Sequence, residues 1–240
     1  MKESCLFKML LGMSVIFILC SRSASQSQTS QTETLVWPEV DGHLQLPSHL
    51  RVLAFAGFEQ GVNDSFQQWY AAAALGYQLK PVLREHLRNI DPDKEHYFVF
   101  GGGYEFLRTI QSGRLIDENR ITIDGTPGSR FPAQFLARDR NLVEFRWIDG
   151  AFSTTYRNML IIQRDFLIHG FRFSPFGSAE VFYNGAQHSW NQEWYTGGIQ
   201  WLYKSLLMIE TYYRRESCAG CKPASWNVGG VTLHFFGITK

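Results

Sequence analysis

The segment Gln67–Lys80 alternates between two kinds of side chain with a period of two. Every second residue from Trp69 to Leu79 is apolar, whereas the alternate positions from Gln68 to Lys80 are small or polar. Side chains of a β-strand point alternately to opposite faces. A helix would need apolar residues near i, i+3, i+4 and i+7, and the polar residues would interrupt that stripe. The segment therefore predicts a strand with lipid on one face and a polar lumen on the other.

Similar alternating segments recur between turn residues along the rest of the chain. They are Thr34–Asp41, His49–Glu59, His96–Arg108, Glu118–Asp124, Arg130–Ala137, Asn141–Ile148, Thr154–Asp165, Phe171–Asn184, Gln192–Lys204, Leu206–Glu216 and Trp226–Ile238. Gly125–Gly128 is interpreted as a turn between two of these segments. The pattern predicts an all-β fold, a closed antiparallel up-and-down transmembrane β-barrel of about twelve strands. Ten strands are the alternative if the two short segments near Gly125 merge.

The N-terminus has the features of an export signal. Two basic residues, Lys2 and Lys8, precede the apolar run Met9–Leu19, and small serine residues follow it. Because a membrane-spanning helix needs about 20 apolar residues, the run is too short to be one. We expect a cleaved signal peptide over residues 1–25, a disordered Ser/Gln-rich linker over 26–33 and the barrel over 34–240. The alternative of a lipoprotein at Cys20 is weakened by the bulky Leu19 before it.

The charged residues indicate which face of each strand lines the lumen. A charge at the bilayer midplane costs about 2–4 kcal/mol, so charged side chains should point inward, where they can pair. The predicted lumen-facing residues are Arg51, Glu105, Glu144, Arg146, Arg157, Arg172, Glu180, Asn184, Glu210 and Arg214. The opposite faces carry aromatic residues that should lie at the membrane interfaces, namely Trp69, Tyr77, Tyr195, Trp201 and Tyr203. A soluble lipocalin-like barrel would reverse the two faces.

Connection lengths predict how the strands run. Outer-membrane barrels have short periplasmic turns and longer outer loops. Counting back from the C-terminus, Ser217–Ser225 and the long segment Pro81–Glu95 both fall on the outer side. Trp69 should then mark the periplasmic interface and Tyr77 the outer one.

Composition narrows the range of partners. The net charge of +1 gives no basic surface for nucleic acid. Removal of the signal leaves two cysteines, Cys218 and Cys221, for which we expect a loop disulfide or two free thiols. A metal site is not expected, and His234 is interpreted as a lumen histidine with satisfied hydrogen bonds. No cofactor is predicted, and the expected partners are the lipid bilayer and the outer-membrane assembly machinery, with the chain a monomer.

Several short motifs occur in a characteristic order. They are Asp139–Arg146 (DRNLVEFR), Tyr156–Asn158 (YRN), Ala179–Asn184 (AEVFYN), Gly197–Trp201 (GGIQW) and Glu210–Tyr213 (ETYY). Over the whole mature chain the sequence resembles the bacterial domain-of-unknown-function family 2490, regarded as outer-membrane-type barrels. The resemblance implies a barrel fold and an outer-membrane location, with no known activity. The chain departs from the pattern of this family at two places. Trp194 occupies a position where a lumen-facing Arg is expected. The chain also continues past Phe236, whereas outer-membrane barrels usually end on an aromatic residue.

The sequence says little about a specific activity. We expect a non-enzymatic, porin-like protein of the Gram-negative envelope, either a passive small pore or a structural or surface barrel with a charged lumen. One alternative is a barrel-type lipid hydrolase, because His188–Gln192 resembles the Asn-bearing strand of outer-membrane phospholipase A. That enzyme needs a His and a nucleophilic Ser on the preceding strand, where this chain offers Ser174 and Ser178 but no His. The other alternative is a soluble periplasmic ligand-binding barrel.

Overall fold

The structure is a computed structural model. It describes residues 32–46, 49–62, 66–79, 97–111, 113–131, 135–168, 171–203, 206–221 and 223–238. The predicted signal peptide, most of the predicted linker and the connection Pro81–Glu95 lie outside these residues. Within the described ranges, no helix is long and apolar enough to cross a membrane.

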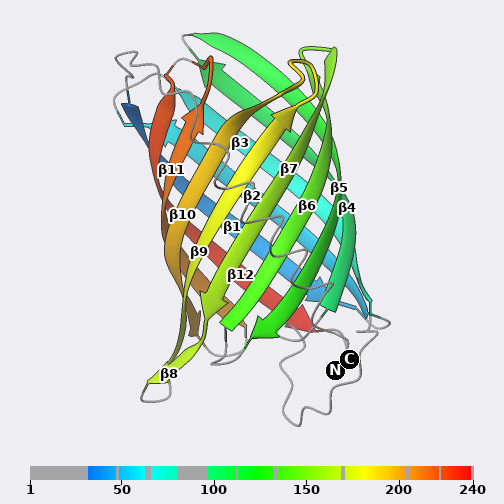
Figure 1. The fold of residues 1–240 in the computed structure, drawn as a ribbon, viewed down its shortest axis with the longest axis vertical. Coiled ribbons are helices and arrows are strands. Elements are labelled where there is room, and N and C mark those ends of the chain that lie inside the picture. Colours follow the sequence, from blue (N-terminus) through cyan, green and yellow to red (C-terminus); the bar gives the residue numbers. More distant parts are fainter. Residues whose placement is uncertain are drawn as a thin grey trace, which may run out of the picture. The chain divides into compact units, whose positions relative to one another are not determined.

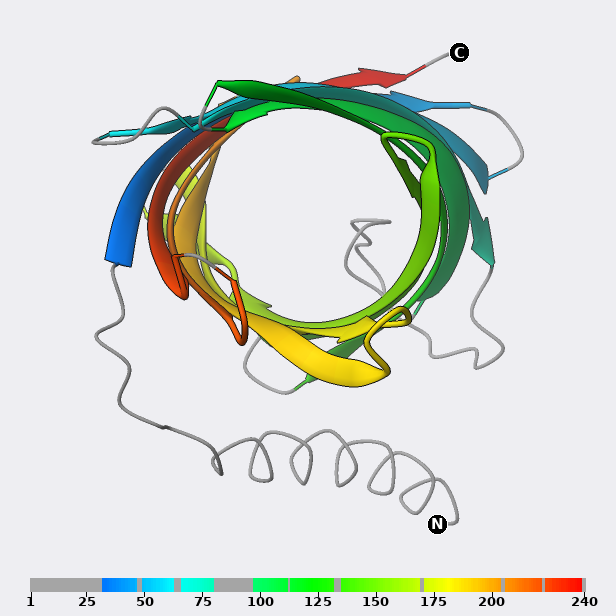
Figure 2. The same cartoon turned by 90° about the horizontal axis from the view of Figure 1, so that it is seen from above.

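The described chain folds into one closed β-barrel, visible along its axis in Figure 2. Its strands are β1 (Thr32–Gln45), β2 (Leu50–Gly61), β3 (Gln67–Leu79), β4 (Tyr97–Gln111), β5 (Arg114–Phe131), β6 (Phe135–Ile148), β7 (Ala151–Arg164), β8 (Phe166–Ile168), β9 (Phe171–Asn184), β10 (Ser189–Tyr203), β11 (Leu207–Cys218) and β12 (Ser225–Ile238). Eleven strands close the barrel, and the short β8 pairs with β9 beyond its rim (Figure 1). The prediction of a closed all-β barrel of about twelve strands is confirmed.

The barrel closes between the first and the last strand, and this pairing is parallel. Thr32 lies opposite Ser225, and the register continues without a shift to Gln45 opposite Ile238. All other neighbouring strands pair antiparallel. An odd number of barrel strands requires this result, because the first and last strands then run in the same direction. The expectation of a wholly antiparallel barrel therefore fails at the closing pair.

The segment Gly125–Gly128 is part of a strand, so the prediction of a turn there is wrong. Its residues pair with β4, where Phe98 lies opposite Pro127. The ladder between β5 and β6 has a gap at the same place, between Gly125 and Gly128. Proline has no backbone N–H and is tolerated in a strand where no ladder hydrogen bond is needed. The glycines and the proline are accommodated inside one long strand.

The three predicted segments Glu118–Asp124, Arg130–Ala137 and Asn141–Ile148 form only two strands, and the prediction of a separate strand at Arg130–Ala137 is wrong because β5 ends and β6 begins within it. The lower strand count changes which loops share an end of the barrel. β3 and β12 run in the same direction, so Leu79 lies at the same end as Ile238. The predicted placement of the β3–β4 connection opposite the C-terminal end is therefore wrong. The assignment of Trp69 to the periplasmic interface and Tyr77 to the outer one loses its basis, because it depended on that count.

The two faces of each strand differ in chemistry as well as in exposure. Large apolar side chains of nearly every strand are exposed on the outside, including Val40, Leu75, Phe100, Ile123, Trp201 and Phe235. The buried polar residues point inward; among them are Asp41, Glu118, Glu144, Glu180, Glu216 and Thr232. The outside of the barrel is therefore largely apolar, and its inside holds buried charged groups together with buried aliphatic residues such as Leu35, Leu142 and Val228.

Candidate functional site

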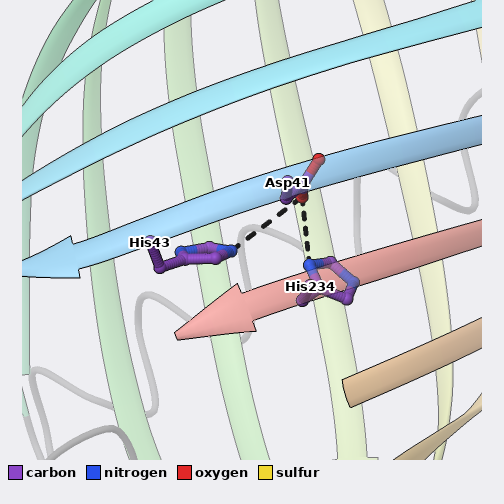
Figure 3. Close-up of side chains that lie close together, drawn as sticks. All are labelled: Asp41, His43 and His234. Atoms are coloured by element: carbon purple, nitrogen blue, oxygen red, sulfur yellow. Dashed lines mark ion pairs between the residues drawn. The ribbon is translucent and has the colours of Figure 1, made fainter. Parts of the chain in front are cut away.

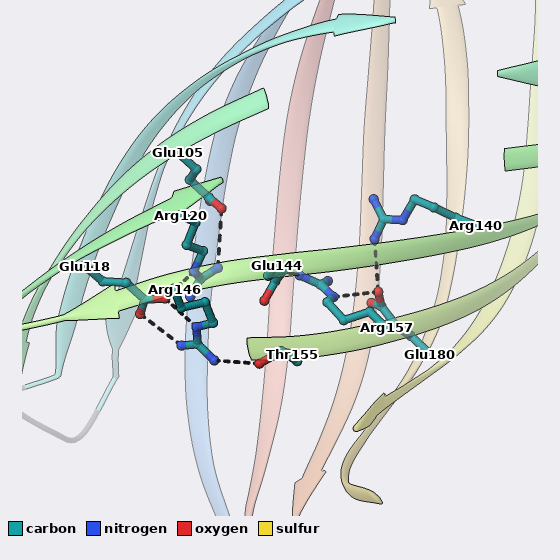
Figure 4. Close-up of polar contacts among 9 residues, drawn as sticks. All are labelled: Glu105, Glu118, Arg120, Arg140, Glu144, Arg146, Thr155, Arg157 and Glu180. Atoms are coloured by element: carbon teal, nitrogen blue, oxygen red, sulfur yellow. Dashed lines mark hydrogen bonds and ion pairs between the residues drawn. The ribbon is translucent and has the colours of Figure 1, made fainter. Parts of the chain in front are cut away.

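The ten residues predicted to face the lumen all lie at inward-facing positions of their strands. Strand alternation places them opposite the exposed apolar positions of the same strands. Six of them join a layer of charged and aromatic side chains near the middle of the barrel, which we call the lumen layer. Its described members are Trp37, Glu39, Tyr70, Glu105, Glu118, Arg120, Arg140, Glu144, Arg146, Thr155, Arg157, Glu180, Phe182, Trp194, Tyr212, Arg214, Glu216 and Thr232 (Figure 4 shows nine of them).

Glu118 is the centre of the first group in the lumen layer. Arg146 holds its carboxylate in a bidentate pair, from Nε to Oε1 at 2.5 Å and from Nη2 to Oε2 at 2.9 Å. Arg120 donates to the same Oε1 at 2.5 Å and lies 3.4 Å from Glu105 on β4. Such a planar guanidinium–carboxylate fork fixes orientation as well as charge. The group joins β4, β5 and β6, and Arg146 extends it to Thr155 on β7 at 3.4 Å.

Arg157 is the centre of the second group. Its Nη1 donates to Glu144 at 2.8 Å and its Nε donates to Glu180 at 2.9 Å. Arg140 adds a second donor to Glu180 at 3.0 Å. The two carboxylates are 2% and 4% exposed, so other side chains rather than water surround them. A carboxylate this buried is stable only when it is paired and hydrogen-bonded, as both are here.

Aromatic rings lie against the guanidinium groups of two arginines of the lumen layer, Arg157 and Arg214. The guanidinium carbon of Arg157 lies 4.6 Å from the ring centre of Phe182 and 5.1 Å from that of Trp194. The guanidinium carbon of Arg214, on β11, lies 4.5 Å from the ring centre of Trp194 and 4.7 Å from that of Trp37. Arginine planes stack favourably on aromatic faces when water is excluded. Trp194, which replaces the expected arginine, therefore connects the two arginines.

Tyr70 extends the layer across the glycine of a neighbouring strand. Its hydroxyl donates to Glu39 on β1 and accepts from the indole N–H of Trp37. β2 lies between β1 and β3, and Gly57 occupies the position that the ring crosses. A Cβ at Gly57 would lie 2.1 Å from the Tyr70 hydroxyl, so a side chain there would displace the ring. Gly57 thus makes the contact from β3 to β1 possible.

The remaining predicted lumen residues lie outside the lumen layer. Arg172 pairs with Asp165 at 3.0 Å, beside the β8 extension. Asn184 ends β9 and accepts hydrogen bonds from the backbone N–H of Ala186 and Gln187, which is a turn-capping role. Glu210 accepts from Gln200 at 2.7 Å. Arg51 faces inward on β2 near its start.

All five predicted interfacial aromatics lie on the outer face. Each of these residues is between 39% and 57% exposed; they are Trp69, Tyr77, Tyr195, Trp201 and Tyr203. A shallow groove of about 640 Å³ also lies on this side, and its outward-facing part includes Gly197, Gly229 and Tyr213. None of the described residues that line the groove is charged, and Tyr212 of the lumen layer is one of them.

The outer face also carries a polar cluster near the middle of β6 and β7 that the sequence analysis did not identify. Asp139 and Asn141 of β6 and Asn158 of β7 lie near the middle of their strands on this side. Asn158 donates to Asp139 at 2.7 Å, and the Tyr156 hydroxyl donates to Asn141 at 2.6 Å. The four side chains satisfy one another, which reduces the cost of placing them on an apolar surface.

Cys218 and Cys221 form a disulfide bond in the connection between β11 and β12. Two of the residues weighed for hydrolysis, Ser174 and His188, lie at opposite ends of β9. Ser174 is near the start of β9 and bonds to Asp165, whereas His188 follows the end of that strand in an exposed turn. This separation removes the geometric support for a Ser–His pair formed by these two residues.

Sequence reasoning placed Trp194 at a lumen-facing position but named no aromatic residue as a partner of the lumen arginines. Trp37 and Phe182 lie on inward faces, but an aromatic residue in alternation looks the same on either face. Arginines on the neighbouring strands could have indicated which aromatic residues face the lumen, because cation–π contacts favour such pairs. Comparisons with protein-family models, curated proteins and solved structures find no match to this chain.

Proposed function

We propose that the chain is an outer-membrane-type β-barrel whose lumen is closed at its middle, and that it serves as a structural or surface barrel. The observation that carries the proposal is the inverted distribution of side chains. Exposed apolar residues cover the outside, while Glu144, Glu180 and Glu118 are buried inside. Lipid is the solvent in which such an outer face is stable. The resemblance to family 2490 and the features of an export signal support the same location.

Packing in the lumen layer favours a closed barrel over an open pore. A water-filled channel would leave its lining charges hydrated, yet Glu144 is 2% exposed and the Arg157 side chain 13%. The guanidinium group of Arg214 contacts the rings of both Trp37 and Trp194, which joins β1 to β10 within the layer. The contacts of the layer run from β4 through β7, β9 and β11 to β1. We infer that ions do not pass through the resting barrel.

Two measurements on the same preparation test the proposal. The full chain, expressed in a Gram-negative host, should fractionate with outer membranes and migrate differently in boiled and unboiled gel samples. A protein that remains in solution without detergent would contradict the membrane location.

Conductance then tests closure separately. Purified barrel that passes the gel test should give no discrete current steps in a planar bilayer. The double variant Arg157→Ala/Arg214→Ala, which removes both central arginines, should give steps and serves as the control for insertion. Steps of the same size from the unmodified protein would contradict closure while leaving the membrane location intact.

A further inference from the structure

The parallel seam between β1 and β12 gathers two histidines and a carboxylate outside the lumen layer (Figure 3). Asp41 lies directly opposite His234 in the register, and His43 lies two residues further along β1. All three side chains point inward, and one ligand atom of each lies within 4.8 Å of the others. The two histidines are 191 positions apart in the chain, so only the closing pair of strands brings them together.

The distances within this cluster fit a small divalent ion. The Oδ2 atom of Asp41 is 3.0 Å from Nδ1 of His234 and 3.9 Å from Nε2 of His43. Tetrahedral zinc has bonds of roughly 2.0–2.2 Å, which separate its ligand atoms by about 3.4 Å. The observed separations lie on both sides of that value. Small side-chain rotations would place all three atoms around one ion.

A second carboxylate supports the orientation of His234. Nε2 of His234 lies 3.7 Å from Glu210, on the opposite side of the ring from Asp41. Gln200 donates to that Glu210 carboxylate at 2.7 Å. In metal sites a ligand histidine commonly donates its other ring N–H to a carboxylate, which fixes the ring and raises its basicity. Glu210 lies at ion-pair distance from Nε2 of His234, where it can take this role, and Gln200 holds the Glu210 carboxylate in place.

One further observation indicates a ligand in addition to a simple ion pair. Oδ1 of Asp41 is buried and accepts no hydrogen bond from the described residues. A buried carboxylate oxygen without a donor is costly unless a cation or water satisfies it. Phe236 also stacks on the His43 ring at 4.8 Å and 20°, which limits the movement of that imidazole.

We propose that Asp41, His43 and His234 bind one divalent transition-metal ion of the zinc class, with a fourth position open to the lumen. Two imidazoles and one carboxylate suit zinc, cobalt, nickel or copper, whereas calcium and magnesium prefer oxygen ligands. The site needs the parallel closure of the barrel and does not depend on whether the lumen conducts ions.

The test is a Co²⁺ titration of the folded full-length chain in detergent after treatment with a chelator. The folded protein should bind one equivalent, with the visible absorption bands of four- or five-coordinate Co²⁺, and Zn²⁺ should displace it. His234→Ala and His43→Phe, which keeps the stack on Phe236, should abolish these bands. Glu210→Gln should weaken binding about 10–100-fold, as loss of a supporting carboxylate does.

His188→Asn is the matched control, since His188 is exposed in a turn with positive φ (51°), which asparagine tolerates. It should bind Co²⁺ like the unmodified protein. Heat-modifiability of each variant shows that the barrel is folded. Absence of saturable binding to the folded unmodified chain, or folded His43→Phe titrating like it, would overturn the proposal.

Discussion

The Tyr70 ring on β3 lies over the backbone of Gly57 on β2, and this contact lets the tyrosine hydroxyl reach Glu39 on β1. Three consecutive strands are thereby joined by one side chain. The Tyr212 ring of β11 likewise lies over Gly230 of β12. Glycine at both positions gives space for an aromatic ring, and at Gly57 that ring connects two strands that do not pair directly.

Substitution of Gly57 by alanine should destabilise the barrel. The new Cβ would lie 2.1 Å from the Tyr70 hydroxyl, so the ring must move and its bond to Glu39 is lost. Overpacking of this kind costs about 1–3 kcal/mol. Gly229→Ala is the control, because a Cβ there meets no atom within 4 Å. Urea unfolding of both variants in lipid vesicles measures the difference, and equal midpoints would show that the Tyr70 ring adapts without cost.

Removal of the Arg157 charge should have the largest effect among the charged residues. Arg157→Met leaves Glu144 without the hydrogen bond that Nη1 of Arg157 donates, and leaves Glu180 with Arg140 as its donor. Loss of one partner from a buried pair costs about 3–5 kcal/mol. Arg114→Met removes an exposed pair with Asp149, at 3.3 Å, and should cost less than about 1 kcal/mol. Comparable losses in the two variants would mean that water reaches the lumen layer.

The polar cluster on the outer face should be dispensable for folding. The quadruple variant Asp139→Ala/Asn141→Val/Tyr156→Phe/Asn158→Val removes the four mutually bonded groups together, which can be nearly neutral or stabilising. Because a charge on the lipid face costs about 2–4 kcal/mol at the midplane, unfolding in vesicles should require the same or more urea. A clear loss of stability would instead indicate that these side chains contact a protein partner in the membrane.

The strands and their faces could be predicted from alternation alone, as β3 illustrates. Trp69, Leu75 and Tyr77 are exposed on the outside, while Tyr70 on the other face is buried. This success has a physical reason, because a shift of one residue would turn every side chain to the wrong face.

The pairing between strands could not be predicted in the same way. Alternation places Glu118, Arg120 and Arg146 inward, but only the register brings the two arginines to the same carboxylate. The strand count failed at Gly125–Gly128, where glycine and proline indicated a turn and a gap in the ladder accommodated them. The parallel pairing of β1 with β12 follows from the odd number of barrel strands, and this pairing brings His43 close to His234. Because the predicted count was even, neither feature could be predicted.

The most direct test of the central claim is the accessibility of a spin label at Ala73, on the outer face of β3. The unmodified position is exposed and lies between Ala54 and Tyr104 in the outer face. Ala186, in the exposed turn after β9, is the matched aqueous position. Labelled Ala73→Cys in vesicles should collide readily with oxygen and poorly with water-soluble chromium oxalate, and labelled Ala186→Cys should show the reverse. Equal access of chromium oxalate to both labels would contradict a barrel whose apolar face meets lipid.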